Sequence, residues 1–265
     1  MDFSKVRLVV TDMDGTLLNS NHEMSAEFFQ LYKSFQAKGI HFAAASGRQH
    51  HSIEEKLNSI KKSISIISEN GAYGRQGKEE LFTIDLKLPI LLNAIEAAKK
   101  TDDVAIVLCG KKHAYFETRN ISFANTILQY YSNYKVVDDF ATITDDTFFK
   151  VAIFHADCSE THILPNVAHL EKDLQVIVSG KNWIDISHKD ANKGMAVKKL
   201  QEILGVSKEE TMAFGDYNND LKMLAEAHFS FAMENAHPNV KAVANFETLS
   251  NEERGVEFIL RQVIA

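Results

Sequence analysis

The chain has 265 residues, of which 45% are hydrophobic, 25% charged and 9% aromatic, and its formal net charge at pH 7 is −7. This composition can bury a sizeable core, which excludes a disordered chain, a collagen and a coiled coil. The negative charge repels a phosphate backbone at long range, so we do not expect nucleic acid as a partner.

The N-terminal segment does not read as an export signal. Its apolar run, Val6 to Val10, is too short for the apolar region of a signal peptide, and no stretch is long and apolar enough to span a bilayer. Cys109 and Cys158 form no CxxC motif, so neither a disulfide framework nor a zinc ribbon is indicated. We therefore expect a soluble, cytoplasmic protein with free thiols and no membrane contact; its oligomeric state stays open.

The first part of the chain alternates short apolar runs with an amphipathic helical pattern. Residues 6–10 predict a buried strand, and a helix follows between a possible N-cap at Ser25 and a stop at Gly39. Residues 40–45 and 64–67 predict two further strands. Each strand ends in polar or glycine residues. Because the carboxyl ends of parallel strands form the ligand crevice of an open α/β sheet, these endings should lie together.

The middle of the chain alternates less regularly. The predicted strands are residues 82–86, 104–108, 114–116, 149–154, 176–178 and 183–186. The predicted helices are residues 89–98, 123–131 and 161–172. Several strands with a few helices between them indicate an α+β insertion, with a mostly antiparallel sheet covered on one face.

The alternation of helices and short apolar strands seen in the first part of the chain resumes at Asn192, with a helical pattern and then a strand at residues 212–214. We therefore expect an α/β fold with a discontinuous, Rossmann-like parallel-sheet core, residues 1–81 and 188–265. Residues 82–187 would form the inserted α+β domain.

Two polar segments follow the first two strands. DMDGT carries Asp12 and Asp14, whose carboxylates are two residues apart and can share a direction on extended backbone. SGR begins at Ser46, where a hydroxyl and backbone amides facing a helix start can hold an anion. Taken singly, an ordinary turn or helix cap is the preferred interpretation of each segment.

Two more polar segments lie in the last third of the chain. Lys193 opens a helix, where its ammonium meets the unfavourable end of the macrodipole, so either an anion compensates it or it points into water. GDYNND, residues 215–220, follows a strand and supplies two acids and two amides, and such hard oxygen ligands suit Mg²⁺. Helix capping is an alternative role for Asn218 to Asp220.

In this order, DMDGT, SGR, KG and GDYNND resemble the four motifs of the haloacid dehalogenase (HAD) phosphohydrolases. Glu69-Asn70-Gly71 and the long insertion resemble the Cof-type sugar-phosphatase branch of that family. The resemblance implies a HAD core with an inserted cap domain. It also implies a Mg²⁺-dependent phosphatase of small phosphorylated metabolites, sugar phosphates first and phosphorylated cofactors such as pyridoxal phosphate or FMN next.

The resemblance further implies a role for each site residue. Asp12 would be the nucleophile that forms an aspartyl-phosphate. Asp14 would act as general acid and base, which requires a pKa well above its ordinary value of about 4. Mg²⁺ would be held by the Asp12 carboxylate, the Asp14 backbone carbonyl and the Asp216 carboxylate, with Asp220 in support. The residues expected to bind the phosphoryl group or the substrate are Ser46, Lys193 and Asn219.

Two other functions would use similar residues. A signalling module that accepts phosphate on an aspartate needs clustered acids, a lysine and Mg²⁺, but neither a general acid nor an insertion. A phosphosugar mutase should offer cap arginines to a distal phosphate, whereas Arg119 is the only arginine between residues 82 and 187. Six residues are conceivable substrate contacts for which a surface or core role is preferred: Arg48, His50, His51, Asn70, Arg119 and Trp183.

Overall fold

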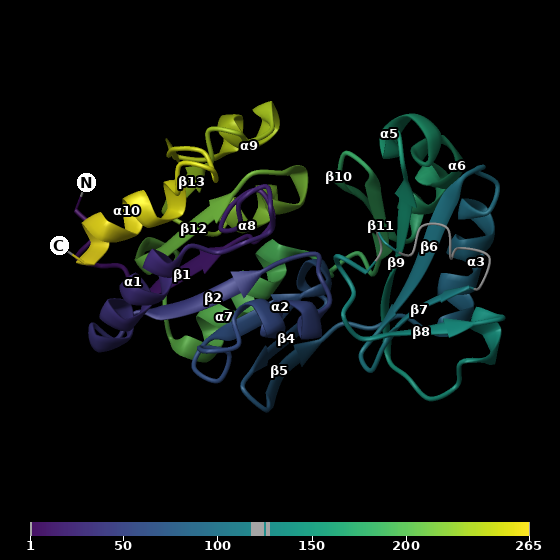
Figure 1. Cartoon of the computed structure of the whole chain (residues 1–265), viewed down its shortest axis with the longest axis horizontal. Coiled ribbons are helices and arrows are strands. Elements are labelled where there is room, and N and C mark those ends of the chain that lie inside the picture. Colours follow the sequence, from purple (N-terminus) through teal and green to yellow (C-terminus); the bar gives the residue numbers. More distant parts are fainter. Residues whose placement is uncertain (1, 118–124, 126–127, 265) are drawn as a thin grey trace.

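The computed structural model describes residues 2–117, 125 and 128–264 and contains two β-sheets, each at the centre of its own unit (Figure 1). We call the unit around the eight-stranded sheet the larger unit and the unit around the six-stranded sheet the smaller unit. The units lie side by side along the long axis of the molecule, and both chain ends lie in the larger unit. The expected α/β fold is confirmed.

The larger sheet is mainly parallel. Its strands are, in spatial order, β14 (Phe246–Glu247), β13 (Phe229–Ala232), β12 (Thr211–Gly215), β1 (Leu8–Thr11), β2 (His41–Ala45), β3 (Ser65–Ser68), β4 (Tyr73–Gln76) and β5 (Glu79–Thr83). The central strand β1 pairs in parallel with β2 and β12, and all its residues are buried, as an unbroken apolar run predicts. The pairings of β4 with β3 and with β5 are antiparallel.

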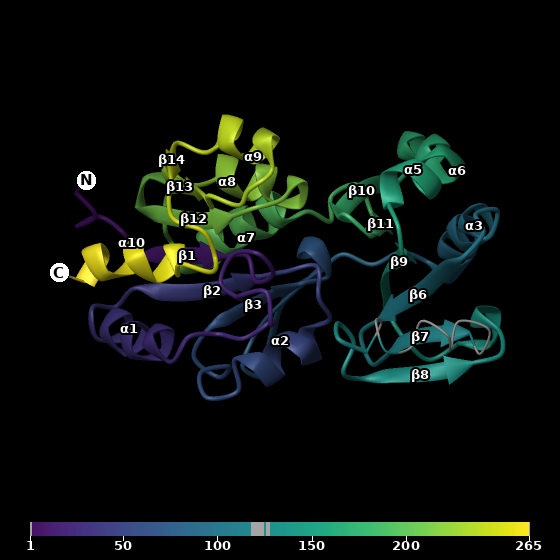
Figure 2. The same cartoon turned by 45° about the horizontal axis from the view of Figure 1, so that its top comes forward.

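Helices cover both faces of this sheet (Figure 2). They are α1 (Ala26–Ala37), α2 (His50–Lys56), α7 (Lys193–Leu204), α8 (Leu221–Ala225), α9 (Pro238–Val243) and α10 (Gly255–Ile264). The steps from β1 to β2 and from β12 to β13 run in opposite directions across the sheet, so right-handed crossovers place α1 and α8 on opposite faces. Accordingly, α1 packs against α10, and α7 packs against α8.

The α1 helix forms as its sequence predicts. Ser25 Oγ accepts a hydrogen bond from the backbone N–H of Phe28 at 3.1 Å, and Gly39 follows the helix with a φ of 72°. One helix face is buried in the core of the larger unit, and its members are Phe28, Leu31, Tyr32 and Phe35. The end of β1 is thereby fixed on a rigid, buried element.

The smaller sheet is mostly antiparallel, as expected. Its strands are, in spatial order, β10 (Gln175–Gly180), β11 (Trp183–Ser187), β9 (Phe148–His155), β6 (Val104–Gly110), β7 (Ala114–Glu117) and β8 (Tyr134–Val137), of which β7 and β8 pair in parallel. The helices α3 (Leu88–Ala98), α5 (Ser159–His162) and α6 (Leu164–Val167) cover the face turned away from the larger unit (Figures 1 and 2). The opposite face of the sheet is turned toward the larger unit.

Three predicted elements of the insertion differ from the structure. The strand expected at residues 82–86 is β5, which ends at Thr83 and forms a hairpin with β4 that extends the larger sheet. The helix expected at residues 161–172 is divided into α5, α6 and a 3-10 helix, because Pro165 has no N–H to continue α5 and instead lies in the first turn of α6.

The helix expected at residues 123–131 lies partly outside the described residues, and Leu128 to Tyr130 form a turn. The strand β8 was not predicted. Among the described helices, none is long and apolar enough to cross a membrane.

Candidate active site

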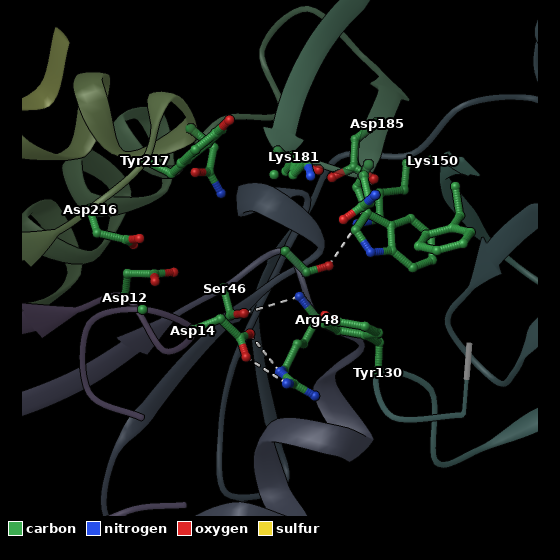
Figure 3. Close-up of a pocket in the computed structure, with 18 of the residues that line it drawn as sticks. Asp12, Asp14, Ser46, Arg48, Tyr130, Lys150, Lys181, Asp185, Asp216 and Tyr217 are labelled. Carbon is green, nitrogen blue, oxygen red and sulfur yellow. Dashed lines mark hydrogen bonds and ion pairs between the residues drawn. The ribbon is translucent and has the colours of Figure 1, made fainter. Parts of the chain in front are cut away.

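Polar side chains at several strand ends of the larger sheet meet at one place (Figure 3). Asp12 follows β1, Ser46 follows β2 and Asp216 follows β12, and all three line a cavity of about 470 Å³. Lys193, the first residue of α7, does not line the cavity but contacts Asp12. The smaller unit supplies the other wall of the cavity. The structure thus brings together the four motifs that the sequence separates by up to two hundred residues.

Lys193 is fully buried and pairs with two carboxylates. Its Nζ donates to Asp12 Oδ1 at 2.5 Å and to Asp220 Oδ1 at 2.7 Å. Burial lowers the pKa of the ammonium, but the two carboxylates outweigh that effect and hold the pKa above its usual value. The anion expected to compensate a lysine at a helix N-terminus is therefore present, and the alternative of a lysine pointing into water is excluded.

Asp12, Asp216 and Asp220 place carboxylate oxygens within 4.8 Å of one another. Both oxygens of Asp220 are engaged: Oδ1 by Lys193, and Oδ2 by the backbone N–H groups of Asp216 at 3.0 Å and Tyr217 at 3.2 Å. Asp220 therefore positions Lys193 and the loop that carries Asp216. Of these three acids, Asp12 and Asp216 face the cavity.

The chemistry of this donor set fits a divalent cation. Burial raises the pKa of Asp12 to about 7, and burial together with repulsion from Asp12 and Asp220 raises the pKa of Asp216 well above its usual value. Both pKa values rise because the ionised carboxylates lie close together and away from water, which is unfavourable. A cation between Asp12 and Asp216 would offset this repulsion. Hard oxygen donors of this kind suit Mg²⁺, although they do not single it out among divalent ions.

Gly15 allows the close approach of Asp216 to the DMDGT loop. Its φ is 78°, and a Cβ at this position would come within 2.3 Å of Asp216 Oδ2. On the same loop, Thr16 Oγ1 donates to Asp216 Oδ1 at 3.1 Å. Glycine and threonine at these two positions therefore fix Asp216 against the first strand end.

Asp14 lies in an ion pair that the sequence did not predict. Arg48 Nε donates to Asp14 Oδ2 and Arg48 Nη2 donates to Asp14 Oδ1, each at 2.6 Å, and His22 Nδ1 lies 3.0 Å from Asp14 Oδ1. Burial would raise the pKa of Asp14, but the hydrogen bonds from His22 and Arg48 lower it well below its usual range. A general acid needs the opposite shift, so the expectation of a raised pKa is wrong for this conformation.

Arg48 also contacts the smaller unit. Its guanidinium is buried, donates through Nη1 to the Gln129 carbonyl at 2.7 Å and lies 4.7 Å from the centre of the Tyr130 ring (Figure 3). A surface or core role was preferred for Arg48. The side chain is indeed buried, but it lines the cavity, so the preference for a role away from the site is wrong. Its place two residues after Ser46, whose Oγ accepts the N–H of Arg48 at 3.1 Å, was the available signal.

A second buried charge cluster joins the units beside the cavity. Lys150 Nζ, from β9, donates to the Gly47 carbonyl at 2.6 Å and pairs with Asp185 Oδ1 at 3.2 Å and with Glu69 Oε2 at 3.3 Å. Burial raises the pKa of Glu69 to about 7. A charged residue inside the otherwise apolar runs FFKVAIF and WIDIS was the signal that could have identified Lys150 and Asp185.

Asn219 connects the two groups of residues. Its Nδ2 donates to Asn70 Oδ1 at 3.1 Å, and Asn70 Nδ2 in turn donates to Asp185 Oδ2. Of the other conceivable substrate contacts, Trp183 lines the cavity, whereas the rings of His50 and His51 contact each other, tilted by 38° with centroids 3.7 Å apart. The remaining candidate, Arg119, lies outside the described residues.

Comparisons with known proteins agree with this geometry. The chain is 30% identical over 262 residues to the 5-amino-6-(5-phospho-D-ribitylamino)uracil phosphatase YbjI of Escherichia coli (strain K12), covering 98% of this chain and 96% of that protein. It is 25% identical over 295 residues to the phosphatase YwpJ of Bacillus subtilis (strain 168), covering 98% and 100%. The crystal structure of SMU.1108c from Streptococcus mutans UA159 matches with a TM-score of 0.89 and 28% identity, over 97% of this chain and 98% of that one.

These relatives confirm the expected enzyme class, a phosphoric monoester hydrolase, and the expected Cof-type branch. The family model described as haloacid dehalogenase-like hydrolase matches residues 9–260. Since that match spans the larger and the smaller unit alike, the protein belongs to the haloacid dehalogenase-like hydrolase family.

Proposed function

We propose that this hydrolase is a Mg²⁺-dependent phosphatase of small phosphorylated metabolites, sugar phosphates above all, and that it works through a phosphoryl group on Asp12. The observation that carries the proposal is that Asp12 and Asp216 face one cavity while the buried Lys193 holds Asp12. The relative from Escherichia coli supports the substrate class, because the compound in its name carries phosphate on a ribityl chain.

Asp12 would attack the phosphorus atom. Lys193 holds Asp12 Oδ1, and no described residue donates a hydrogen bond to Oδ2, which leaves that oxygen for the new O–P bond as the ester P–O bond breaks. A divalent cation held by Asp12 and Asp216 would supply charge neutralisation between two anions. Lys193 and Ser46 would stabilise the charge that spreads over the transferring phosphoryl oxygens.

Asp14 would give a proton to the leaving alkoxide and then take one from the water that hydrolyses the phosphorylated Asp12. In the conformation described here, Arg48 and His22 keep Asp14 ionised. Asp14 must therefore part from Arg48 and take up a proton before the leaving group departs. Because Arg48 is also bound to Gln129 and Tyr130 of the smaller unit, we propose that this step is coupled to the position of that unit.

We further propose that residues 82–187 act as a cap over a core formed by residues 1–81 and 188–265. The cavity lies between residues of both parts, and Lys150 bridges them through Gly47 and Glu69. A cap in this place would exclude bulk water during transfer and contact the organic part of the substrate.

The test is a screen of phosphorylated metabolites, with and without Mg²⁺, scored by release of inorganic phosphate. Asp12→Asn should abolish turnover and leave the circular dichroism spectrum unchanged, whereas Asp173→Asn, at an exposed aspartate of the smaller unit, should change neither. Near-normal turnover by the Asp12→Asn variant would refute the proposal. With hexose monophosphates, formation of an isomerised ester in place of free phosphate would favour the phosphosugar mutase instead.

A further inference from the structure

The cavity has two chemically different ends. Asp12, Ser46 and Asp216 form the end at the larger sheet, where the phosphate would bind. The other end is formed by aromatic side chains of the smaller unit, and these are Tyr130, Tyr131, Phe154 and Trp183. The part of a substrate that remains outside the phosphate site would therefore meet rings.

The strand register places these rings on the cavity side of the smaller sheet. Trp183 of β11 lies opposite Phe154 of β9, with ring centroids 5.1 Å apart. Because side chains alternate along a strand, Ile184 and Ile186 point the other way and pack in the cluster beneath the helices. Tyr130 completes the group, with its ring centroid 5.4 Å from that of Trp183.

The indole of Trp183 is held at its edges, with no parallel partner in the described part of the chain. Its interplanar angles to Phe154, Tyr131 and Tyr130 are 57°, 61° and 71°. Trp183 lines the cavity, and its side chain is only partly buried. A ligand ring that entered the cavity could therefore lie against the indole in an offset stack, the geometry that aromatic pairs prefer.

Lys181 also lines the cavity, but two other polar side chains near this end, Asp185 and Asn182, are already engaged with other protein groups. Lys150 and Asn70 occupy the two oxygens of Asp185. Asn182 Nδ2 donates to three backbone carbonyls of residues 155–157. A sugar hydroxyl placed here would lose hydration and could gain these partners only by breaking existing hydrogen bonds.

We propose that the aromatic end binds a flat, unsaturated ring in the leaving group, with Trp183 as the residue that determines this specificity. The preferred ester is then a sugar or sugar-alcohol phosphate that carries a heteroaromatic ring, and a plain sugar phosphate is a poorer substrate. This inference rests on the proposed function, because it assumes that the phosphate lies at Asp12. Beyond that function, Trp183 would select the substrate by stacking on its ring.

The test uses pairs of esters that differ in the ring. One pair is uridine 5′-monophosphate and ribose 5-phosphate, and the other is FMN and ribitol 5-phosphate. Stacking on an aromatic side chain predicts a kcat/KM about tenfold or more higher for the ring-bearing member. Trp183→Ala should remove most of that ratio, and Trp183→Phe should retain part of it.

Tyr134→Ala is the matched control. Tyr134 is an exposed aromatic residue of the same sheet that stacks on Phe116 and does not line the cavity. Its removal should leave the ratio within each pair unchanged. Equal kcat/KM values within both pairs, or an equal loss for both members in Trp183→Ala, would overturn the inference. Absence of turnover with all four esters would refute the proposed function as well, so the two failures are distinguishable.

A binding measurement tests the contact without relying on turnover. Trp183 is the only tryptophan of the chain, so intrinsic tryptophan fluorescence reports on this one side chain. In the Asp12→Asn variant, uridine 5′-monophosphate should quench the emission in a saturable manner, and ribose 5-phosphate should not. Saturable binding of both compounds with no difference in quenching would place the ring away from Trp183 and overturn the inference.

Discussion

Lys150→Met tests whether charge holds the buried cluster between the two units. Lys150 is 1% exposed, and its ammonium has three partners within 3.3 Å: Gly47, Glu69 and Asp185. Methionine fills a similar volume but leaves two carboxylates buried without their cation. Removing one partner of a buried ion pair costs about 3–5 kcal/mol, a large fraction of the stability of a typical protein.

The size of this loss should depend on pH. Burial raises the pKa of Glu69 from 4.5 to about 7, so the folded protein binds a proton there more tightly than the unfolded chain. Between these values the stability contributed by Glu69 falls as pH rises. At pH 8 Glu69 is ionised and needs Lys150, whereas at pH 5 it is protonated and needs it less. We therefore expect a loss that is about 1–2 kcal/mol smaller at pH 5 than at pH 8.

Urea unfolding of the wild-type protein and the variant at the two pH values measures both quantities. Lys112→Met is the control, because Lys112 pairs with Asp145 at the surface, where water and salt screen such a pair and leave it little effect on stability. Combining Lys150→Met with Glu69→Gln should remove the dependence on pH. A loss at pH 8 no larger than that of Lys112→Met, or the same loss at both pH values, would refute the reasoning.

Two further predictions concern the metal. Gly15→Ala should raise the Mg²⁺ concentration needed for half-maximal turnover by about tenfold or more, because the added Cβ would displace Asp216. Gly39→Ala is the control. Gly39 has a similar φ, but a Cβ there would meet no atom within 4 Å, so this variant should cost only about 1 kcal/mol of backbone strain. Unchanged Mg²⁺ dependence in Gly15→Ala would contradict the proposed ligand. Adding Mg²⁺ to protein treated with EDTA should restore turnover and raise the melting temperature, since a bound ion stabilises the folded state. Asp216→Asn should lose that thermal shift in a differential scanning experiment, and an undiminished shift would place the ion elsewhere.

The site at the end of the larger sheet could be predicted because its residues belong to local patterns. Asp12, Ser46 and Asp216 each follow a short apolar run, and one rule about the ends of parallel strands places them together. Lys193 was expected to need an anion, and Asp12 and Asp220 supply it. In these cases the position of the element determines the position of the side chain.

The rest depended on contacts between distant segments. Nothing local indicates the two contacts of Arg48, because the pair with Asp14 joins the ends of two strands of the larger sheet and the hydrogen bond to the Gln129 carbonyl arises where the units meet. A surface or core role was preferred for Trp183, yet the register of β11 places its side chain at the cavity. The hairpin of β4 and β5 did leave a signal in the sequence, which is Gly77 between the two strands. This residue adopts a φ of 56°, which favours glycine.

The position of β1 has a consequence for how the chain folds during synthesis. This strand is synthesised before the other described strands, yet one of its two partners is β12, whose register joins Leu8 to Thr211. All strands of the smaller sheet lie between residues 104 and 187, so every pairing within that sheet is available earlier. One edge of β1 therefore stays unpaired until the residues of β12 have been translated. An unpaired apolar edge of a nascent chain can pair wrongly or bind a chaperone.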